Sequence, residues 1–180
     1  MPLQFLMFTT GPAFIWGESG GTNPVAVTHA LPVNGLASGT GAAMGAFADL
    51  GENFDQEFSL WIYVNTGAVA PTVANTADVF LLWSHNGTLW PGKVTGSAGS
   101  YTRGTSDANL RQCGTNYSLP ATADANALIG RPPFRIVPAA RYVVPVIANS
   151  FGAAFANSSP ASANQTRIIL QARRNKLSET

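Results

Sequence analysis

Charged residues are scarce in this sequence of 180 residues. Only 11% of them are Asp, Glu, Lys or Arg, against roughly 25% in an ordinary globular chain. Because 46% are hydrophobic, the composition is not that of a disordered protein, which is poor in apolar residues and rich in charge. A formal net charge of +1 gives no broad cationic surface. We therefore expect a folded protein without nucleic-acid or membrane partners.

Cysteine and long apolar runs are also scarce. The single cysteine, Cys113, cannot form a disulfide within the chain, and we interpret it as a passive residue. No uncharged apolar run approaches the roughly 20 residues that span a bilayer. The apolar residues of 1–16 follow no Lys or Arg and are interrupted by Gly11 and Pro12, so they do not read as a signal peptide. We expect a soluble protein made in the cytoplasm.

Helical periodicity of useful length is missing, and the 18 Gly and 12 Pro residues discourage long helices. Only residues 42–50 offer a short helix. What is present is strand-like alternation, clearest from Phe58 to Val64, where both faces are apolar and a central strand is indicated. Further strands are predicted at residues 78–83, 133–137, 141–147 and 165–173, with weaker ones at 3–8 and 25–31.

Turn residues separate these strands. Asn86-Gly87 predicts a turn that uses positive φ angles, and Pro138-Ala139-Ala140 predicts a tight link. Pro145 cannot donate to a strand ladder, so we expect it at a sheet edge or a bulge. Several short antiparallel strands without helices predict an all-β fold, an antiparallel β-sandwich or jelly-roll-like domain with long loop embellishments.

We predict one domain over residues 1–180. Residues 1–53 would form an N-terminal arm with strands and a Gly/Ala-rich loop, and residues 54–173 the core sandwich. A long insertion would occupy residues 84–131, and residues 174–180 would form a basic C-terminal tail. Loops longer than about 15 residues tend to be functional or disordered.

The long insertion contains aromatic and arginine residues, which are enriched at the cores of protein interfaces. Trp90, Tyr101, Arg103 and Arg111 are therefore candidates for an assembly interface. The alternative is that this insertion covers its own sheet.

The few charges are segregated along the chain. Up to Gly92 there are six acidic and no basic residues, whereas all ten Lys and Arg residues follow from Lys93 onward with three acids. Either distant strands interleave and neutralise each other, or the subunit has an acidic and a basic pole that steer assembly. Arg173, Arg174 and Lys176 form the densest basic cluster, and we include them in the candidate assembly interface as a group that docks on an acidic surface.

Residues with catalytic or metal-binding potential do not form a recognisable set. The run Gly17-Glu18-Ser19-Gly20-Gly21 resembles the nucleophile loop of trypsin-like serine proteases, but no histidine precedes Ser19. His29, His85 and Cys113 are too far apart in sequence to indicate a metal site. Asp55 and Glu57 would suit a pair of glycosidase carboxylates, but a solvated strand entry explains them too. We assign no catalytic residue, cofactor or metal, and we predict that the protein is not an enzyme.

Two stretches carry a family resemblance. Residues 77–91 (ADVFLLWSHNGTLWP) are one, and the segments 127–130, 133–137, 141–144 and 149–156 make up the other. Over about residues 58–173 the chain resembles a group of small structural proteins of tailed bacteriophages. That resemblance implies a β-sandwich virion component that decorates or cements the head, or a place on the tail.

These observations lead to one expected function and two alternatives. The expected function is a capsid decoration protein in the virion, assembled in the host cytoplasm, that binds the major capsid protein and copies of itself. The first alternative is a tail-associated or host-recognition module that binds carbohydrate through Trp90 and Tyr101. The second, an enzyme, would depend on Ser19 or Glu57.

Overall fold

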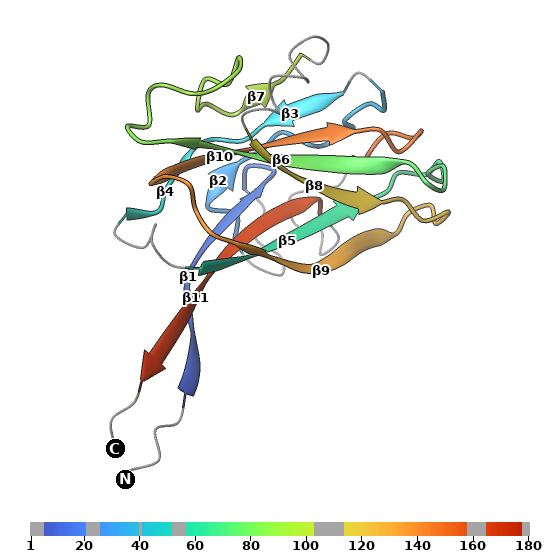
Figure 1. Ribbon diagram of the computed structural model, residues 1–180. Helices are drawn as coiled ribbons and strands as arrows, with labels where there is room; N and C mark the ends of the chain where they lie inside the picture. The colour runs from blue at the N-terminus through green and yellow to red at the C-terminus, as the bar shows by residue number, and fades with distance from the viewer. Residues whose placement is uncertain are drawn as a thin grey trace.

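The computed structural model is an all-β sandwich of two sheets (Figure 1). It describes residues 6–20, 26–39, 41–51, 57–102, 114–157 and 165–177. The strands are β1 (Leu6–Gly17), β2 (His29–Ala30), β3 (Ala42–Met44), β4 (Ala48–Asp49), β5 (Glu57–Asn65), β6 (Thr76–Ser84), β7 (Gly99–Ser100), β8 (Gly114–Pro120), β9 (Leu128–Ile136), β10 (Tyr142–Asn149) and β11 (Arg167–Leu177). A five-stranded sheet has the order β2-β1-β11-β5-β9, and a six-stranded sheet has the order β7-β3-β10-β6-β8 with β4 also paired to β10. The predicted two-sheet sandwich is confirmed, and its pairs are antiparallel except β1 with β2.

The strongest strand predictions are confirmed. β5 lies inside its sheet between β11 and β9, and its inward side chains Phe58, Leu60, Ile62 and Val64 are fully buried. They pack in one cluster with inward residues of β1, β6, β10 and β11. The predicted N-terminal arm (1–53) and the predicted core sandwich (54–173) therefore share a single core. Gly87 has a φ of 70°, as the predicted turn requires.

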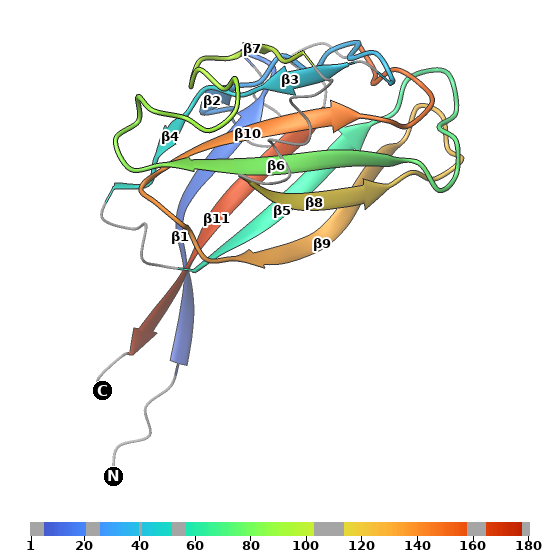
Figure 2. The ribbon, with the colours of Figure 1, turned by 45° about the horizontal axis from the view of Figure 1, so that its top comes forward.

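Strands β1 and β11 extend beyond the sandwich as a two-stranded ribbon (Figures 1 and 2). We call residues 6–10 and 173–177 the terminal ribbon; Leu6 pairs with Leu177 and Thr10 with Arg173. Gly11 and Pro12 together face one residue of β11, which forms a β-bulge where the ribbon leaves the sandwich. The prediction of a separate basic tail from residue 174 is therefore wrong for residues 174–177, because backbone pairing with β1 continues β11 through them.

Two segments predicted as loop or helix form strands instead. Residues 42–50 contain β3 and β4, since pairing with β10 outweighs the weak helical preference of a segment that contains Gly45. The predicted insertion 84–131 contains β7, β8 and the start of β9. β8 is an edge strand with a neighbour on one side only. Most of its residues are polar, so its sequence does not predict a strand, although Leu119 points inward and is buried.

Pro145 lies in the interior strand β10, so the prediction of an edge position is wrong, although the pairing is interrupted there as at a bulge. β3 pairs as far as Val146 and β4 resumes at Val143, so Pro145 faces the gap between these two short strands. Its carbonyl accepts the N–H of Gly45, and its missing N–H falls on the same side, where no ladder bond is required.

The rest of the predicted insertion covers its own sheet. Outward side chains of the six-stranded sheet, among them Phe80, Leu82 and Val146, form a second buried cluster with Val94 and Tyr101 from the segment 85–102. This second cluster supports the alternative in which the insertion covers its own sheet. Apolar and aromatic side chains of the segment 85–102 therefore cover an apolar sheet face that would otherwise be exposed to solvent.

Gly45 is expected to tolerate no side chain. A Cβ there would lie 2.8 Å from Cδ1 of Trp16 and 2.9 Å from Cγ of Pro145. We predict that Gly45→Ala lowers the free energy of unfolding by about 1 to 3 kcal/mol, the usual cost of overpacking, as measured by urea denaturation. Gly99→Ala is the matched control, because a Cβ at position 99 meets nothing within 4 Å. Equal stability of the two variants would contradict this account of the contact.

Candidate functional site

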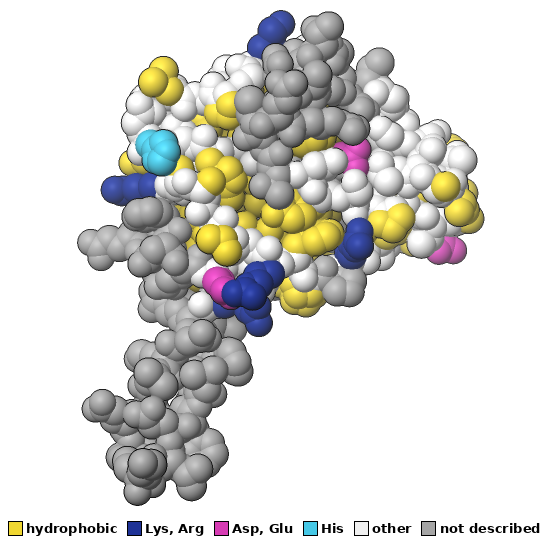
Figure 3. Space-filling view, in the orientation of Figure 1, with side chains coloured by type: hydrophobic (Ala, Val, Ile, Leu, Met, Phe, Trp, Pro, Cys, Tyr) yellow, Lys and Arg dark blue, Asp and Glu magenta, His cyan; other side chains and the backbone are white. Residues whose placement is uncertain are grey.

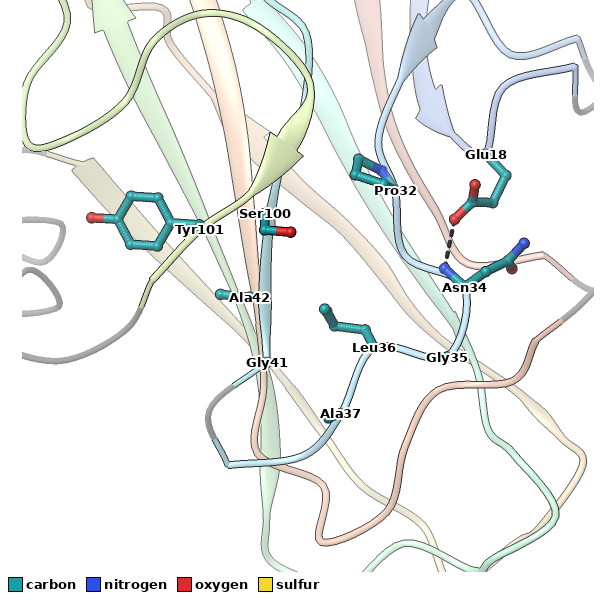
Figure 4. Close-up of a pocket in the computed structure, with 10 residues that line it drawn as sticks. All are labelled: Glu18, Pro32, Asn34, Gly35, Leu36, Ala37, Gly41, Ala42, Ser100 and Tyr101. Atoms are coloured by element: carbon teal, nitrogen blue, oxygen red, sulfur yellow. Dashed lines mark hydrogen bonds between the residues drawn. The ribbon is translucent and has the colours of Figure 1, made fainter.

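An open groove of about 520 Å³ lies beside β3 and β7 (Figure 4). Its lining residues are Glu18, Pro32, Asn34, Gly35, Leu36, Ala37, Gly41, Ala42, Ser100 and Tyr101. We call it the Glu18 groove, since Glu18 is the one ionisable carboxyl group among these residues. Figure 4 shows the Ser100 hydroxyl directed toward the loop that carries Pro32 and Leu36, while the Tyr101 ring points away from it.

Glu18 follows directly after β1 and holds the opposite wall of the groove. Its Oε1 atom accepts the backbone N–H groups of Val33 and Asn34, both at 2.5 Å. Two successive amides thus fix the carboxylate in place, and charge-assisted bonds of this kind are stronger than neutral ones. The side chain is only half-buried, so the negative charge stays accessible from the groove.

The loop that forms this wall is tied to the end of β10. Asn149 is fully buried, and its Nδ2 atom donates to the carbonyls of Leu36 at 2.7 Å and Ala153 at 2.9 Å. Gly41 closes the loop, because a Cβ there would lie 1.9 Å from the carbonyl oxygen of Ala37. The groove is therefore held in shape by hydrogen bonds from two side chains to the backbone of its own loop.

The chemistry of the groove suits binding. It offers a fixed carboxylate, the Ser100 hydroxyl, the Asn34 side chain and an apolar floor at Leu36. Such a set recognises a cationic or hydroxylated group in a shallow site. Sequence reasoning noticed this loop for Ser19, which is exposed, and missed the role of Glu18. The glycines of residues 17–21 indicated a tight turn, but they did not indicate that the Glu18 carboxylate would accept two backbone amides.

His29, one of the two histidines of the chain, lies against aromatic rings. Its ring centre is 5.4 Å from that of Trp16 and 6.0 Å from that of Phe14, and Nδ1 is 2.8 Å from Oγ1 of Thr28. Burial lowers the pKa of His29 below its ordinary value. Within the described ranges, neither histidine is hydrogen-bonded to Ser19. Asp55, the partner considered for Glu57, lies outside those ranges.

The aromatic candidates of the assembly interface serve internal packing. Tyr101 is 5% exposed and belongs to the second buried cluster, so its ring packs within the chain, and its place in an assembly interface stays a prediction. Trp90 is half-buried, donates from Nε1 to the Gly87 carbonyl at 3.2 Å and packs 6.2 Å from the Phe47 ring. These contacts fix the segment 85–102 onto its sheet. Arg103 and Arg111 lie outside the described residues, as does Cys113.

The acidic and basic halves of the sequence interleave. Arg141 donates to both carboxylate oxygens of Asp49, at 2.6 and 2.7 Å, and Arg135 pairs with Glu57. Both pairs join the early acidic part to the later basic part, so the alternative of two whole poles is not what the structure supports. Arg173 stands opposite Glu57 in the register of β11 with β5, and Arg174 and Lys176 continue along β11 into the terminal ribbon.

Trp61 and Tyr63 form an aromatic platform on the outer face of the five-stranded sheet. Their ring planes are 4° apart with centres separated by 6.3 Å, and both side chains are half-buried. Tyr63 lies over Gly130 of the neighbouring strand, where a Cβ would be 2.8 Å from its Cδ1. Figure 3 shows hydrophobic side chains gathered over the middle of the face in view, with few charged side chains among them.

Comparisons with known proteins supply no family. Neither models of protein families, nor curated proteins, nor solved structures gave a match to this chain. The described residues contain no group of three or more His, Cys, Asp or Glu side chains that could hold a metal ion. Within the same residues, no helix has the length and apolar character needed to cross a membrane.

The ion pair of Asp49 with Arg141 predicts a pH-dependent contribution to stability. The hydrogen bond from Arg141 lowers the pKa of Asp49 below its ordinary value of 3.8 in the folded state. Its stabilisation is therefore present above pH 3.8 and is lost as the pH falls through the lowered value. We predict that Asp49→Asn is less stable than the wild type at pH 7, by under about 1 kcal/mol for such an exposed pair, and equally stable near pH 2.

Urea unfolding from pH 2 to 7 measures this difference. Asn retains an oxygen that can accept the Gly51 N–H now bound by Asp49 at 2.8 Å, so the variant removes the charge and the Oδ2 acceptor of Arg141 while keeping the turn. Asp124→Asn is the control, since Asp124 is exposed and takes part in neither of these two ion pairs. A difference that stays constant over this pH range would show that Asp49 acts through something other than its charge.

Proposed function

We propose that the protein is a structural component of a bacteriophage virion that decorates the outer surface of the head and stabilises the shell as an oligomer. Its partners would be the major capsid protein and further copies of itself. The observation that carries this proposal is the terminal ribbon. The sequence resemblance of residues 58–173 to small phage structural proteins agrees with it.

The terminal ribbon has the properties of an assembly arm. Beyond the pairing of Arg173 with Glu57, β11 has β1 as its only partner in the described part of the chain, and over residues 6–10 β1 has only β11. Both outer edges of the ribbon thus present backbone N–H and C=O groups that can pair with another chain. A two-stranded ribbon is only marginally stable in water, so contact with a partner would stabilise it.

The charge of the ribbon defines the surface that it fits. Three of the five residues on its β11 strand are basic, Arg173, Arg174 and Lys176, and its β1 strand, residues 6–10, contains no charged residue. Opposite potentials steer association and fix the register of a contact. An acidic protein surface, on the capsid or on a neighbouring subunit, is therefore the expected partner of the ribbon.

Location in purified particles tests this function. Particles from a lysate that contains the protein are purified on a density gradient and labelled with gold-conjugated antibody against the protein. We expect label over the head, and we expect particles that lack the protein to release their DNA at a lower temperature. Label on the tail alone, or unchanged heat stability of particles without the protein, would contradict the decoration role.

Carbohydrate recognition is the second candidate, and the platform of Trp61 and Tyr63 favours it. Two nearly parallel rings on a sheet face offer apolar surface to the C–H groups of a sugar ring, and Ser59 and Gln171 lie in the next outward row of the same sheet. This platform replaces the pair of Trp90 and Tyr101, of which Tyr101 is buried. Arg135 and Glu57 neutralise each other beside it, which leaves little net charge there.

A glycan array measures the second candidate directly. If it holds, the wild type binds a subset of glycans and Trp61→Ala loses the signal by tenfold or more, whereas Trp90→Ala, outside the platform, retains it. Because Trp61 is half-buried, thermal unfolding of the variant checks that the fold is kept. Equal binding by Trp61→Ala and the wild type would exclude the platform as a sugar site.

A further inference from the structure

We propose that the terminal ribbon of one copy binds the Glu18 groove of a second copy, with Glu18 as the anionic contact for the basic residues of the ribbon. The inference rests on the proposed function and names one partner of the assembly arm, a second copy of this chain. Three observations support it: the complementary charges of the two surfaces, their positions on the molecule and the sheet edges that they present.

Charge complementarity is the first observation. Of the acids that the structure describes, Asp49 and Glu57 are paired with arginines of the same chain, Asp78 is buried and bound to Ser118 at 2.6 Å, and Asp124 is exposed outside the groove. Glu18 differs, because its described partners are backbone amides and its charge faces a groove. The ribbon has three bases and no acid, so the two surfaces carry opposite charge.

Position on the molecule is the second observation. β1 begins in the terminal ribbon at Leu6 and ends at Gly17, directly before Glu18. A strand of 12 residues at about 3.3 Å per residue spans about 40 Å, so the ribbon of a chain cannot reach its own groove. Figures 1 and 2 agree in placing the ribbon at the opposite end of the molecule from β3 and β7.

This arrangement determines the kind of contact. Two different surfaces at opposite ends of one subunit make a head-to-tail contact, which closes into a ring or continues as a filament according to the rotation between subunits. Each copy in the assembly would then donate one ribbon and accept another. A contact of this kind joins neighbouring decoration subunits around or between capsomers.

Sheet edges are the third observation. β7, which contributes Ser100 to the groove, is the end strand of its sheet order, and β2 is the end strand of the other sheet. The groove therefore lies at the side of the sandwich where both sheets end. A ribbon with open edges can add to such an end strand through backbone hydrogen bonds, while side-chain charges set the register.

Self-association of two complementary variants tests the inference. Glu18→Lys reverses the charge of the groove, and the double variant Arg174→Glu/Lys176→Glu reverses that of the ribbon. We expect the wild type to self-associate in sedimentation equilibrium at low salt, and each variant alone to associate at least about tenfold more weakly. An equimolar mixture should regain association with one-to-one stoichiometry, because the intact ribbon of the first variant fits the intact groove of the second and the reversed ribbon of the second matches the reversed groove of the first.

Further variants separate charge from folding. Glu18→Gln keeps an oxygen acceptor for the amides of Val33 and Asn34 while removing the charge, and it should weaken association to an intermediate degree. Asp124→Lys reverses an exposed acid outside the groove and should associate like the wild type. Thermal unfolding confirms that each variant is folded.

The inference is overturned if the wild type is monomeric throughout, if the groove variant associates like the wild type, or if the mixture stays monomeric. These outcomes are distinct from failure of the proposed function. Protein that labels heads while Glu18→Lys associates normally would leave the decoration role intact and exclude this contact. If the protein is absent from particles but its two variants still associate with each other, the contact stands and the decoration role is excluded.

Discussion

Trp16 joins the two sheets of the sandwich at the point where β1 crosses the short strands. Trp16 belongs to the five-stranded sheet, is fully buried and donates from Nε1 to the Ala46 carbonyl at 2.7 Å. Its ring lies against Gly45, between β3 and β4, where Pro145 interrupts the ladder. Gly45, Pro145 and the Trp16 indole therefore lie together. Together they allow β1 to pack against β3 and β4.

The position of β1 in turn determines both surfaces that we connect with function. Toward the N-terminus, the bulge at Gly11 and Pro12 releases the strand from the sandwich together with β11 and produces the terminal ribbon. Toward the C-terminus, the strand ends beside the loop that Glu18 holds through two amides. One strand thus separates an arm from a groove by its own length, and this separation favours contacts between molecules over contacts within one.

The two outer sheet faces differ in what covers them. On the six-stranded sheet, the segment 85–102 buries the outward apolar side chains under Val94 and Tyr101. On the five-stranded sheet, Trp61 and Tyr63 remain half-exposed above Gly130. Among the described residues, Asp49 and Glu57 are neutralised by arginines, whereas Glu18 is in neither of these ion pairs.

The fold class and the strongest strands could be predicted from local sequence patterns. Alternation of large apolar residues from Phe58 to Val64 is a local signal for a strand. Because both of its faces are apolar, it also indicates a position inside a sheet with a neighbouring strand on each side. Low charge and frequent glycine and proline likewise excluded disorder and long helices through composition alone. Weak strands such as β3, β4 and β8 could not be predicted, because their pairing energy comes from distant residues rather than from their own side chains.

Which side chains remain at the surface, and what they face, depends on how the folded chain packs. Trp90 and Tyr101 have the composition of an interface, yet packing turns them onto their own sheet, because an uncovered apolar face is costly in water. The basic residues after Arg173 read as a tail until backbone pairing with residues 6–9 made them part of a ribbon. Glu18 became a candidate contact only when the fold placed its carboxylate in a groove about 26 to 36 Å along β1 from the bases that match it. Burial and long-range pairing depend on residues far apart in the chain, and for that reason local sequence patterns could not settle these outcomes.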